Sequence, residues 1–213
     1  MIDKKINISY LGRMDYASAV KIQENERTRV LSSSSCGSVF LLEHVPAVIT
    51  LGRHAARENL KVKAEYAMQC GYQVAMSSRG GDITVHEPGQ LVVYYVLPVK
   101  SKDTGRFIRN LVSPVADMLN SIYKCDVYYD ASRPGIWHGN EKLCFSGFDL
   151  TGKVSMHGIS INICNTLDGF SYIVPCGMEG ISLTTLCRLA EKQISVREVA
   201  HEITTIYEKL FND

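Results

Sequence analysis

The chain has 213 residues, of which 46% are hydrophobic and 21% are charged, and this ordinary globular mixture excludes a disordered or membrane-embedded chain. The length suits one α/β domain over residues 1–213, since no repeat, linker or break in composition divides the sequence. The formal net charge of +1 argues against a broad nucleic-acid-binding surface, which requires a basic field. A local basic patch for an acidic protein partner stays open.

The hydrophobic pattern then predicts alternating strands and helices in chain order. Asp15 caps a helix that runs to about Leu31. Pro114 kinks or restarts a helix between Phe107 and Tyr123. The predicted strands are 6–11, 39–44, 47–51, 73–77, a four-residue strand before His86, 91–97, 127–129, 135–137, 141–150 and 154–163. Further helices are predicted at 63–70, through Leu186 and Leu189, and after a Ser195–Glu198 capping box, with Val199, Ile203, Ile206 and Leu210 on the inner face of the last one.

Neither membrane insertion nor secretion is indicated. The longest apolar run, 91–99, is too short to cross a bilayer, and the first residues lack the apolar core of a signal peptide. The seven cysteines include no CxxC pair, so we expect neither a disulfide framework nor a zinc site. These features favour a cytoplasmic protein with no membrane partner.

The stretch RGGDITVHEPGQ, which begins at Arg79, is one candidate for a binding site. Its adjacent glycines, Gly80 and Gly81, allow positive φ and a close approach of a ligand to the backbone. A tight turn between two strands is the alternative explanation. Arg79 and His86 favour the binding site, because they place polar groups around a floor of small residues. The stretch is no phosphate loop, since GxxxxGK[ST] is absent and the glycines precede a strand.

The second candidate lies at the two ends of residues 139–177, where a predicted hairpin begins with Lys142 and a Pro-Cys-Gly reversal holds Cys176. In such a reversal the amides of Cys176 and Gly177 could point at a reacting oxygen. A nearby lysine would lower the pKa of the thiol as a cation or accept its proton as a neutral base. The alternative is a solvated lysine at a strand start, with Cys176 a small apolar side chain like the other six cysteines, of which Cys144 and Cys164 are expected within apolar strands.

The histidines give a weaker signal. His157 lies beside Gly158 in a strand rich in Ile and Met, so a hydrogen-bonded core histidine is the simpler interpretation, although the glycine leaves room for a ligand. His44, His54, His138 and His201 form no pattern that assigns them a role. A Cys–His–Asp hydrolase therefore stays open from composition, because no spacing selects its histidine.

Four motifs in order, RGGDITVHEPGQLVVYYV, EKLCFSG, HGISINI and VPCGMEG, closely resemble the lipoyl(octanoyl) transferases of the lipoate and biotin ligase superfamily over about residues 5 to 190. The resemblance implies a single α/β (α+β) domain with a mixed sheet flanked by helices, and a catalytic dyad of Cys176 and Lys142. It also implies an acyl pocket that includes Arg79, Gly80, Gly81, Asp82, Ile83, Thr84, Val85, His86, Phe145, Ser146, Gly147, His157, Gly158, Ile159 and Ser160.

The resemblance further implies a reaction without cofactor or metal. Octanoyl passes from octanoyl-acyl carrier protein to Cys176, and then to the lysine of a lipoyl domain of a 2-oxoacid dehydrogenase or of the glycine-cleavage carrier protein. Backbone amides near Cys176 and in residues 142–147 are the expected oxyanion donors. An ATP-dependent lipoate or biotin ligase and a non-catalytic acyl-carrier-binding member are the alternatives. Cys176, which a ligase does not need, disfavours the first, and the intact pair of Cys176 and Lys142 disfavours the second.

The sequence departs from the family pattern at four positions. The family usually has Lys or Gln at Asp82, an aromatic residue at Val85 and Gly at Glu87, and the region of Asp149 is often basic. The dyad and the glycines are intact, so these departures bear on the choice of acyl chain or carrier protein rather than on the chemistry.

Overall fold

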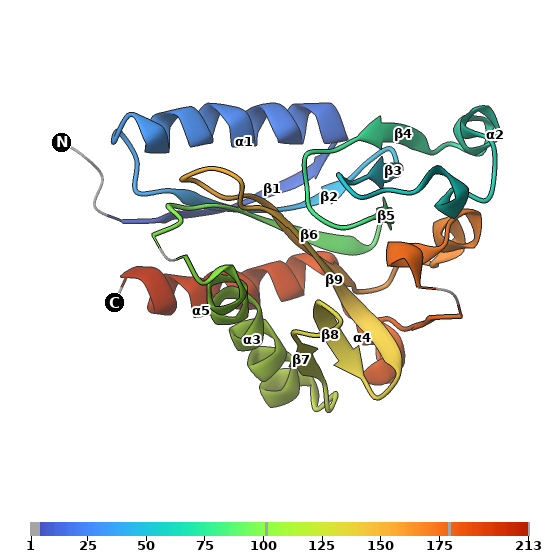
Figure 1. The fold of residues 1–213 in the computed structure, drawn as a ribbon. Helices are drawn as coiled ribbons and strands as arrows, with labels where there is room; N and C mark the ends of the chain where they lie inside the picture. Colours follow the sequence, from blue (N-terminus) through green and yellow to red (C-terminus); the bar gives the residue numbers. More distant parts are fainter. Residues whose placement is uncertain (1–4, 101, 179, 213) are drawn as a thin grey trace.

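The structure, a computed structural model, describes residues 5–100, 102–178 and 180–212. Figure 1 shows a twisted central sheet with helix α1 (Tyr16–Leu31) across one face and helices α3 (Thr104–Tyr123) and α5 (Val196–Asn212) across the other. A smaller sheet lies at the end of the large sheet that is remote from both chain termini. The α/β class predicted from the sequence, with a mixed sheet flanked by helices, is confirmed.

Eleven strands form the two sheets in the part of the chain that the structure describes. The strands are β1 (Asn7–Met14), β2 (Ser38–His44), β3 (Val48–Leu51), β4 (Gln73–Met76), β5 (Ile83–His86), β6 (Gln90–Val96), β7 (Tyr128–Asp130), β8 (Gly135–His138), β9 (Glu141–Asp149), β10 (Met156–Asn162) and β11 (Ser182–Leu183). Within the described ranges, the large sheet has eight strands in the order β1-β2-β6-β10-β9-β8-β7, with β11 paired to β9. The pairs β1–β2 and β9–β11 are parallel and the others antiparallel, so the sheet is mixed. The small sheet has the order β4-β3-β5.

Shorter helical segments connect the strands. They are η1 (Arg57–Asn59), α2 (Ala64–Gln69), η2 (Asp168–Tyr172), η3 (Pro175–Gly177) and α4 (Leu186–Leu189). The predicted cap of α1 is confirmed, because Asp15 accepts a hydrogen bond from the Ser18 amide at 2.9 Å. The predicted capping box is also confirmed, with Ser195 and Glu198 bonded reciprocally at the start of α5. In the part of the chain that the structure describes, we find no helix with the length and apolar character needed to cross a bilayer.

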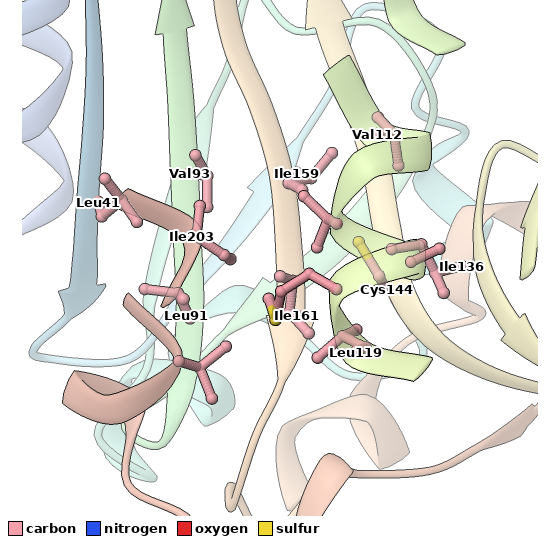
Figure 2. Packing of buried hydrophobic residues seen from close by; sticks show 14 of the residues in the cluster. Leu41, Leu91, Val93, Val112, Leu119, Ile136, Cys144, Ile159, Ile161 and Ile203 are labelled. Carbon is pink, nitrogen blue, oxygen red and sulfur yellow. The ribbon is translucent and has the colours of Figure 1, made fainter. Parts of the chain in front are cut away.

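The core fills both faces of the large sheet, as strand alternation requires. Leu91, Val93 and Tyr95 of β6 pack toward α3 and α5, whereas Val92 and Tyr94 face the side of α1. Figure 2 shows the first of these layers, in which side chains of β2, β6, β9 and β10 meet those of α3 and α5. Cys144 lies inside this layer and is fully buried, which confirms it as a core cysteine.

Three local predictions are wrong. Of the two alternatives for Pro114, the restart is wrong, because α3 runs as one helix from Thr104 to Tyr123, whereas the kink stays a prediction; the carbonyl left unpaired by the proline belongs to Asn110, which is exposed and can bond to water. Leu210 is 49% exposed, and Tyr207 takes the inner position on α5. Cys164 follows the end of β10 and is exposed, rather than lying within an apolar strand.

Candidate active site

A narrow slot lies where the small sheet meets the large one. β5 supplies one wall, and β6, β9 and β10 supply much of the rest. The space open to the centre of a water-sized sphere is about 40 Å³, so the slot is slim. It brings together the glycine-rich stretch, the hairpin and Cys176, which are far apart in the sequence. The lining residues are Tyr16, Arg79, Gly81, Thr84, His86, Val92, Tyr94, Phe145, Ser146, Gly147, His157, Gly158, Ile159, Ser160 and Cys176.

Alternation along β5 decides which residues of the glycine-rich stretch face the slot. Thr84 and His86 line the slot, whereas Ile83 and Val85 point the other way into an apolar cluster with Ile49 of β3. The residues expected in the pocket that fall outside its lining are Gly80, Asp82, Ile83 and Val85. The sequence resemblance gave the segment that borders the slot but no information on side-chain direction.

Cys176 occupies the chain reversal that the Pro-Cys-Gly sequence predicts. Its backbone is left-handed, with φ 55°, and Gly177 follows with φ 66°. The Gly177 amide donates to the Val174 carbonyl at 3.1 Å. The expectation that this amide points at a reacting oxygen is therefore wrong in this structure, and the turn offers at most the amide of Cys176 itself.

A polar clamp fixes the position of the Cys176 turn. The Asp82 carboxylate accepts hydrogen bonds from the Ala56 amide at 3.1 Å and from Asn59 Nδ2, and the Asn59 carbonyl accepts from the Val174 amide at 2.8 Å. A Cβ at Gly177 would lie 2.7 Å from Asp82 Oδ2. Asp82 thus supports the Cys176 turn from outside the slot, and the close packing requires glycine at position 177.

Lys142 is buried, with 1% of its surface exposed. Its Nζ lies 4.9 Å from the ring centroid of Trp137 and 5.0 Å from that of Phe145. Among the described residues, no carboxylate forms an ion pair with it. Burial lowers the pKa of Lys142 from its usual value, and the charge of Cys176 is the strongest influence in the opposite direction. The alternative of a solvated lysine at a strand start is therefore wrong.

Arg79 places a buried positive charge at the slot. Its Nε and Nη2 donate to Thr50 Oγ1 at 3.0 and 2.9 Å, and Nη1 donates to the Gly80 carbonyl at 3.2 Å. Burial lowers its pKa, and Cys176 is the first of the groups that act to raise it. The guanidinium and the thiol are therefore within electrostatic reach of each other.

The histidines near the slot are held neutral. Burial lowers the pKa of His157 to about 4, and the Nε2 atom of this ring lies 2.9 Å from Ser78 Oγ. Burial also lowers the pKa of His86 well below its usual range. Gln90 uses its amide nitrogen to donate to the Val85 carbonyl, so its oxygen accepts a hydrogen bond from His86 Nδ1 at 2.9 Å. A proton on Nδ1 leaves Nε2 of the neutral ring as the unprotonated nitrogen.

Comparison with known proteins identifies the family. Residues 15–208 match the family described as the lipoyl protein ligase A/B catalytic domain. The chain is 34% identical over 209 residues to an octanoyltransferase of Caldicellulosiruptor bescii, covering 97% of this chain and 91% of the relative. It is 35% identical over 204 residues to an octanoyltransferase of Solibacter usitatus, covering 95% and 91%. The chain belongs to this family, in its octanoyltransferase branch.

Solved structures of the superfamily share the fold. A lipoate-protein ligase A bound with ATP has a TM-score of 0.77 at 16% identity and covers 96% of this chain and 85% of the other. A bipartite lipoate protein ligase of Thermoplasma acidophilum gives 0.75 at 15% identity, with 97% and 84% covered. A biotin protein ligase of Aquifex aeolicus with biotin and ATP gives 0.57 at 15% identity, with 95% and 69% covered. At these identities the likeness concerns the fold alone.

Two departures from the family pattern have structural roles here. Glu87, where the family usually has Gly, is buried and accepts hydrogen bonds from Asn165 Nδ2 and the Leu167 amide at 2.9 and 2.8 Å. It thereby ties the segment before η2 to the end of β5. Asp149 pairs with Arg53 at 2.7 Å, and it does not line the slot.

The sequence interpretation missed Tyr16, Val92 and Tyr94, which line the slot, and His44, whose Nε2 lies 2.7 Å from the Tyr94 hydroxyl. All seven residues of β6 are buried, so its pattern could not show which face borders the slot. The available signal was Tyr94, which lies in a mainly aliphatic strand. A buried tyrosine hydroxyl needs a hydrogen-bond partner, so this residue indicates a polar group nearby.

Proposed function

We propose that this chain takes octanoyl from octanoyl-acyl carrier protein and passes it, as a thioester on Cys176, to the lysine of a lipoyl domain. The acceptors we propose are the lipoyl domains of 2-oxoacid dehydrogenases and the glycine-cleavage carrier protein, and a cytoplasmic location belongs to the same proposal. The observation that carries it is the position of Cys176 on the wall of a narrow slot, within electrostatic reach of the buried Lys142.

In the first half-reaction Lys142 takes the thiol proton of Cys176. The lowered pKa of the buried lysine makes the neutral amine, the form that can accept this proton, easier to populate than it is in water. The thiolate attacks the thioester carbonyl and forms a tetrahedral intermediate. Collapse of that intermediate expels the thiol of the carrier, which leaves with the proton from Lys142.

The acyl chain lies in the slot during both half-reactions. Val92 and Phe145 give it apolar walls, and Gly147, Gly158 and Ile159 also line the slot. Each buried methylene contributes roughly 0.8 kcal/mol of binding free energy. In the second half-reaction the lysine amine of the lipoyl domain attacks the thioester, and Cys176 leaves as a thiol. Because the acyl group is stored on the enzyme, the two protein substrates bind in turn and the kinetics are ping-pong.

Intact mass spectrometry tests the acyl-enzyme directly. After incubation with octanoyl-acyl carrier protein, the wild-type chain gains the mass of one octanoyl group, and Cys176→Ala gains none and turns over no substrate. Cys144→Ala and Cys164→Ala are the controls, because Cys144 is buried in the core and Cys164 lies outside the slot. An octanoyl adduct on Cys176→Ala together with none on Cys144→Ala or Cys164→Ala would move the nucleophile elsewhere.

The energy source separates a transferase from an adenylating ligase. A thioester donor is already activated, so octanoyl transfer from the carrier protein is indifferent to ATP and to magnesium chelation. Free octanoate requires a nucleotide, and the sequence has no GxxxxGK[ST] phosphate loop. Transfer from free octanoate plus ATP, with none from octanoyl-acyl carrier protein, would overturn the proposal in favour of a ligase.

A further inference from the structure

The proposed reaction passes twice through a tetrahedral intermediate whose oxygen carries a negative charge, and catalysis of such steps depends on hydrogen-bond donors aimed at that oxygen. The donors expected from the sequence are largely engaged. The Gly177 amide bonds to the Val174 carbonyl. Residues 142–147 lie on β9, which pairs with β10 on one side and with β8 and β11 on the other, so the sheet ladders occupy most of their amides. Another donor is needed.

Thr84 has a hydroxyl that the fold leaves without a partner. The residue is 4% exposed, and among the described residues its Oγ1 is one of three buried side-chain atoms that make no hydrogen bond. A buried, unbonded hydroxyl is uncommon and costs free energy unless something outside the protein satisfies it. Because Ile83 and Val85 face the apolar cluster, the Thr84 side chain points into the slot that Cys176 also lines. β5 packs directly against the η3 turn that carries the thiol.

The surroundings of Thr84 are electropositive. Thr84 lies opposite Thr50 in the β3–β5 pairing, and Thr50 Oγ1 accepts hydrogen bonds from Arg79. The buried guanidinium therefore lies on the same face of the small sheet as the Thr84 side chain. A hydroxyl beside a buried cation, in a slot that excludes most water, is suited to a developing oxyanion, since electrostatic interactions strengthen when solvent is excluded.

We propose that the Thr84 hydroxyl donates a hydrogen bond to the oxyanion of the tetrahedral intermediates, with the charge of Arg79 beside it. When Cys176 Sγ bonds to the thioester carbon, the carbonyl π electrons move to the oxygen, and that oxygen accepts from Thr84 Oγ1–H. When the intermediate collapses, the electrons return, the bond from the carbon to the carrier sulfur breaks, and the hydroxyl keeps its proton throughout. This inference rests on the proposed acyl transfer and adds a catalytic residue to it.

Three variants test the assignment. Thr84→Val removes the hydroxyl at nearly constant shape, Thr84→Ser keeps it, and Thr184→Val removes another buried, unbonded hydroxyl whose side chain does not line the slot. The measurement is the single-turnover rate of Cys176 acylation by octanoyl-acyl carrier protein, followed by intact mass. Thr84→Val is expected to slow acylation by about a hundredfold or more. Thr84→Ser and Thr184→Val are expected to stay within about tenfold of wild type, well short of the effect of a lost oxyanion donor.

Alkylation of Cys176 by iodoacetamide distinguishes oxyanion stabilisation from a structural role. Alkylation is a displacement at a saturated carbon and forms no oxyanion, so its rate stays at the wild-type value in Thr84→Val while acylation falls. An equal fall of both rates, a loss of acylation in Thr84→Ser, or full acylation in Thr84→Val would each overturn the role of Thr84. Failure of the wild-type chain to become acylated would instead overturn the proposed function itself.

Discussion

Lys142 gives the sharpest test of the site, because its chemical and structural contributions can be separated. The side chain is 1% exposed and passes beside Gly135, where an added Cβ would lie 2.8 Å from Lys142 Cε. The methylene chain therefore fills core volume, whereas the ammonium is buried with no ion pair among the described residues. We compare Lys142→Ala, which empties this volume, with Lys142→Met, which keeps most of it and removes the ammonium.

The two variants are expected to lose activity alike and stability differently. Loss of a general acid–base group lowers turnover on the order of a hundredfold or more in both. Lys142→Ala removes three buried methylenes, each contributing roughly 0.8 kcal/mol, and leaves a cavity. Lys142→Met fills the space without the cost of burying a charge. The free energy of unfolding of Lys142→Met is therefore at least about 2 kcal/mol above that of Lys142→Ala. The sequence-based expectation that a lysine at a strand start contributes little to the core is corrected by its burial.

The assays are steady-state octanoyl transfer from the carrier protein and urea unfolding of the same samples. Near-normal turnover of Lys142→Met would refute a catalytic role for the lysine, whatever its stability. Equal unfolding free energies of the two variants would refute the packing argument and leave the catalytic one intact. The conclusion on catalysis depends on Lys142→Met, which keeps the packing. Partial unfolding of Lys142→Ala therefore cannot be mistaken for the loss of a catalytic group.

Two further predictions concern protonation. Burial lowers the pKa of His44 and His157 to about 4 in the folded protein, so between pH 7.5 and about 5 the unfolded chain binds more protons than the folded one. The contribution of the neutral histidines to stability is then complete above pH 7, and each histidine lowers the free energy of unfolding by about 2 kcal/mol as the pH falls to about 5. Urea unfolding at pH 7 and pH 5 measures this loss. An unchanged free energy of unfolding at pH 5 would contradict the prediction that both histidines are buried and neutral. The pH profile of Cys176 alkylation shows how Lys142 acts: in Lys142→Met the apparent pKa of the thiol rises if the lysine acts as a cation, and stays or falls if it acts as a neutral base.

Local patterns predicted the elements of the fold well, because each depends on interactions that are close in sequence. The Asp15 cap, the Ser195–Glu198 box and the Pro-Cys-Gly reversal all lie where the sequence indicates. The errors arise where tertiary contacts decide. Leu210 fits the period of α5, but the helix end extends beyond the core and leaves this side chain exposed. Pro114 is tolerated because the carbonyl it frees belongs to an exposed residue.

In the candidate site, too, the sequence predicted the local segments, whereas side-chain direction and long-range contacts appear only in the structure. The resemblance located the segments around Arg79, Lys142, His157 and Cys176, and the fold brings three of these side chains to one slot, with Lys142 buried beside Phe145 of its wall. It could not give side-chain direction, so Ile83 and Val85 were expected in the pocket although they pack into the apolar cluster around Ile49 and do not line the slot. His44 was left without a role, because its partner Tyr94 is fifty residues away in the sequence and meets it only through the pairing of β2 with β6.

The polar groups of the slot can coexist with an alkyl chain only if the protein already satisfies them, because an unpaired buried dipole opposes apolar binding. This condition is met around most of the slot. Tyr16 donates to Ser77, and His157 bonds to Ser78. Arg79 is held by Thr50 and Gly80. These paired groups give the octanoyl chain nothing to compete with, and the neutral histidines add no charge. The Thr84 hydroxyl breaks this pattern among the described lining residues. An unpaired donor in a slot for hydrocarbon has a use only at the end where the substrate carries its carbonyl, and in the proposed reaction that is the end where Cys176 attacks.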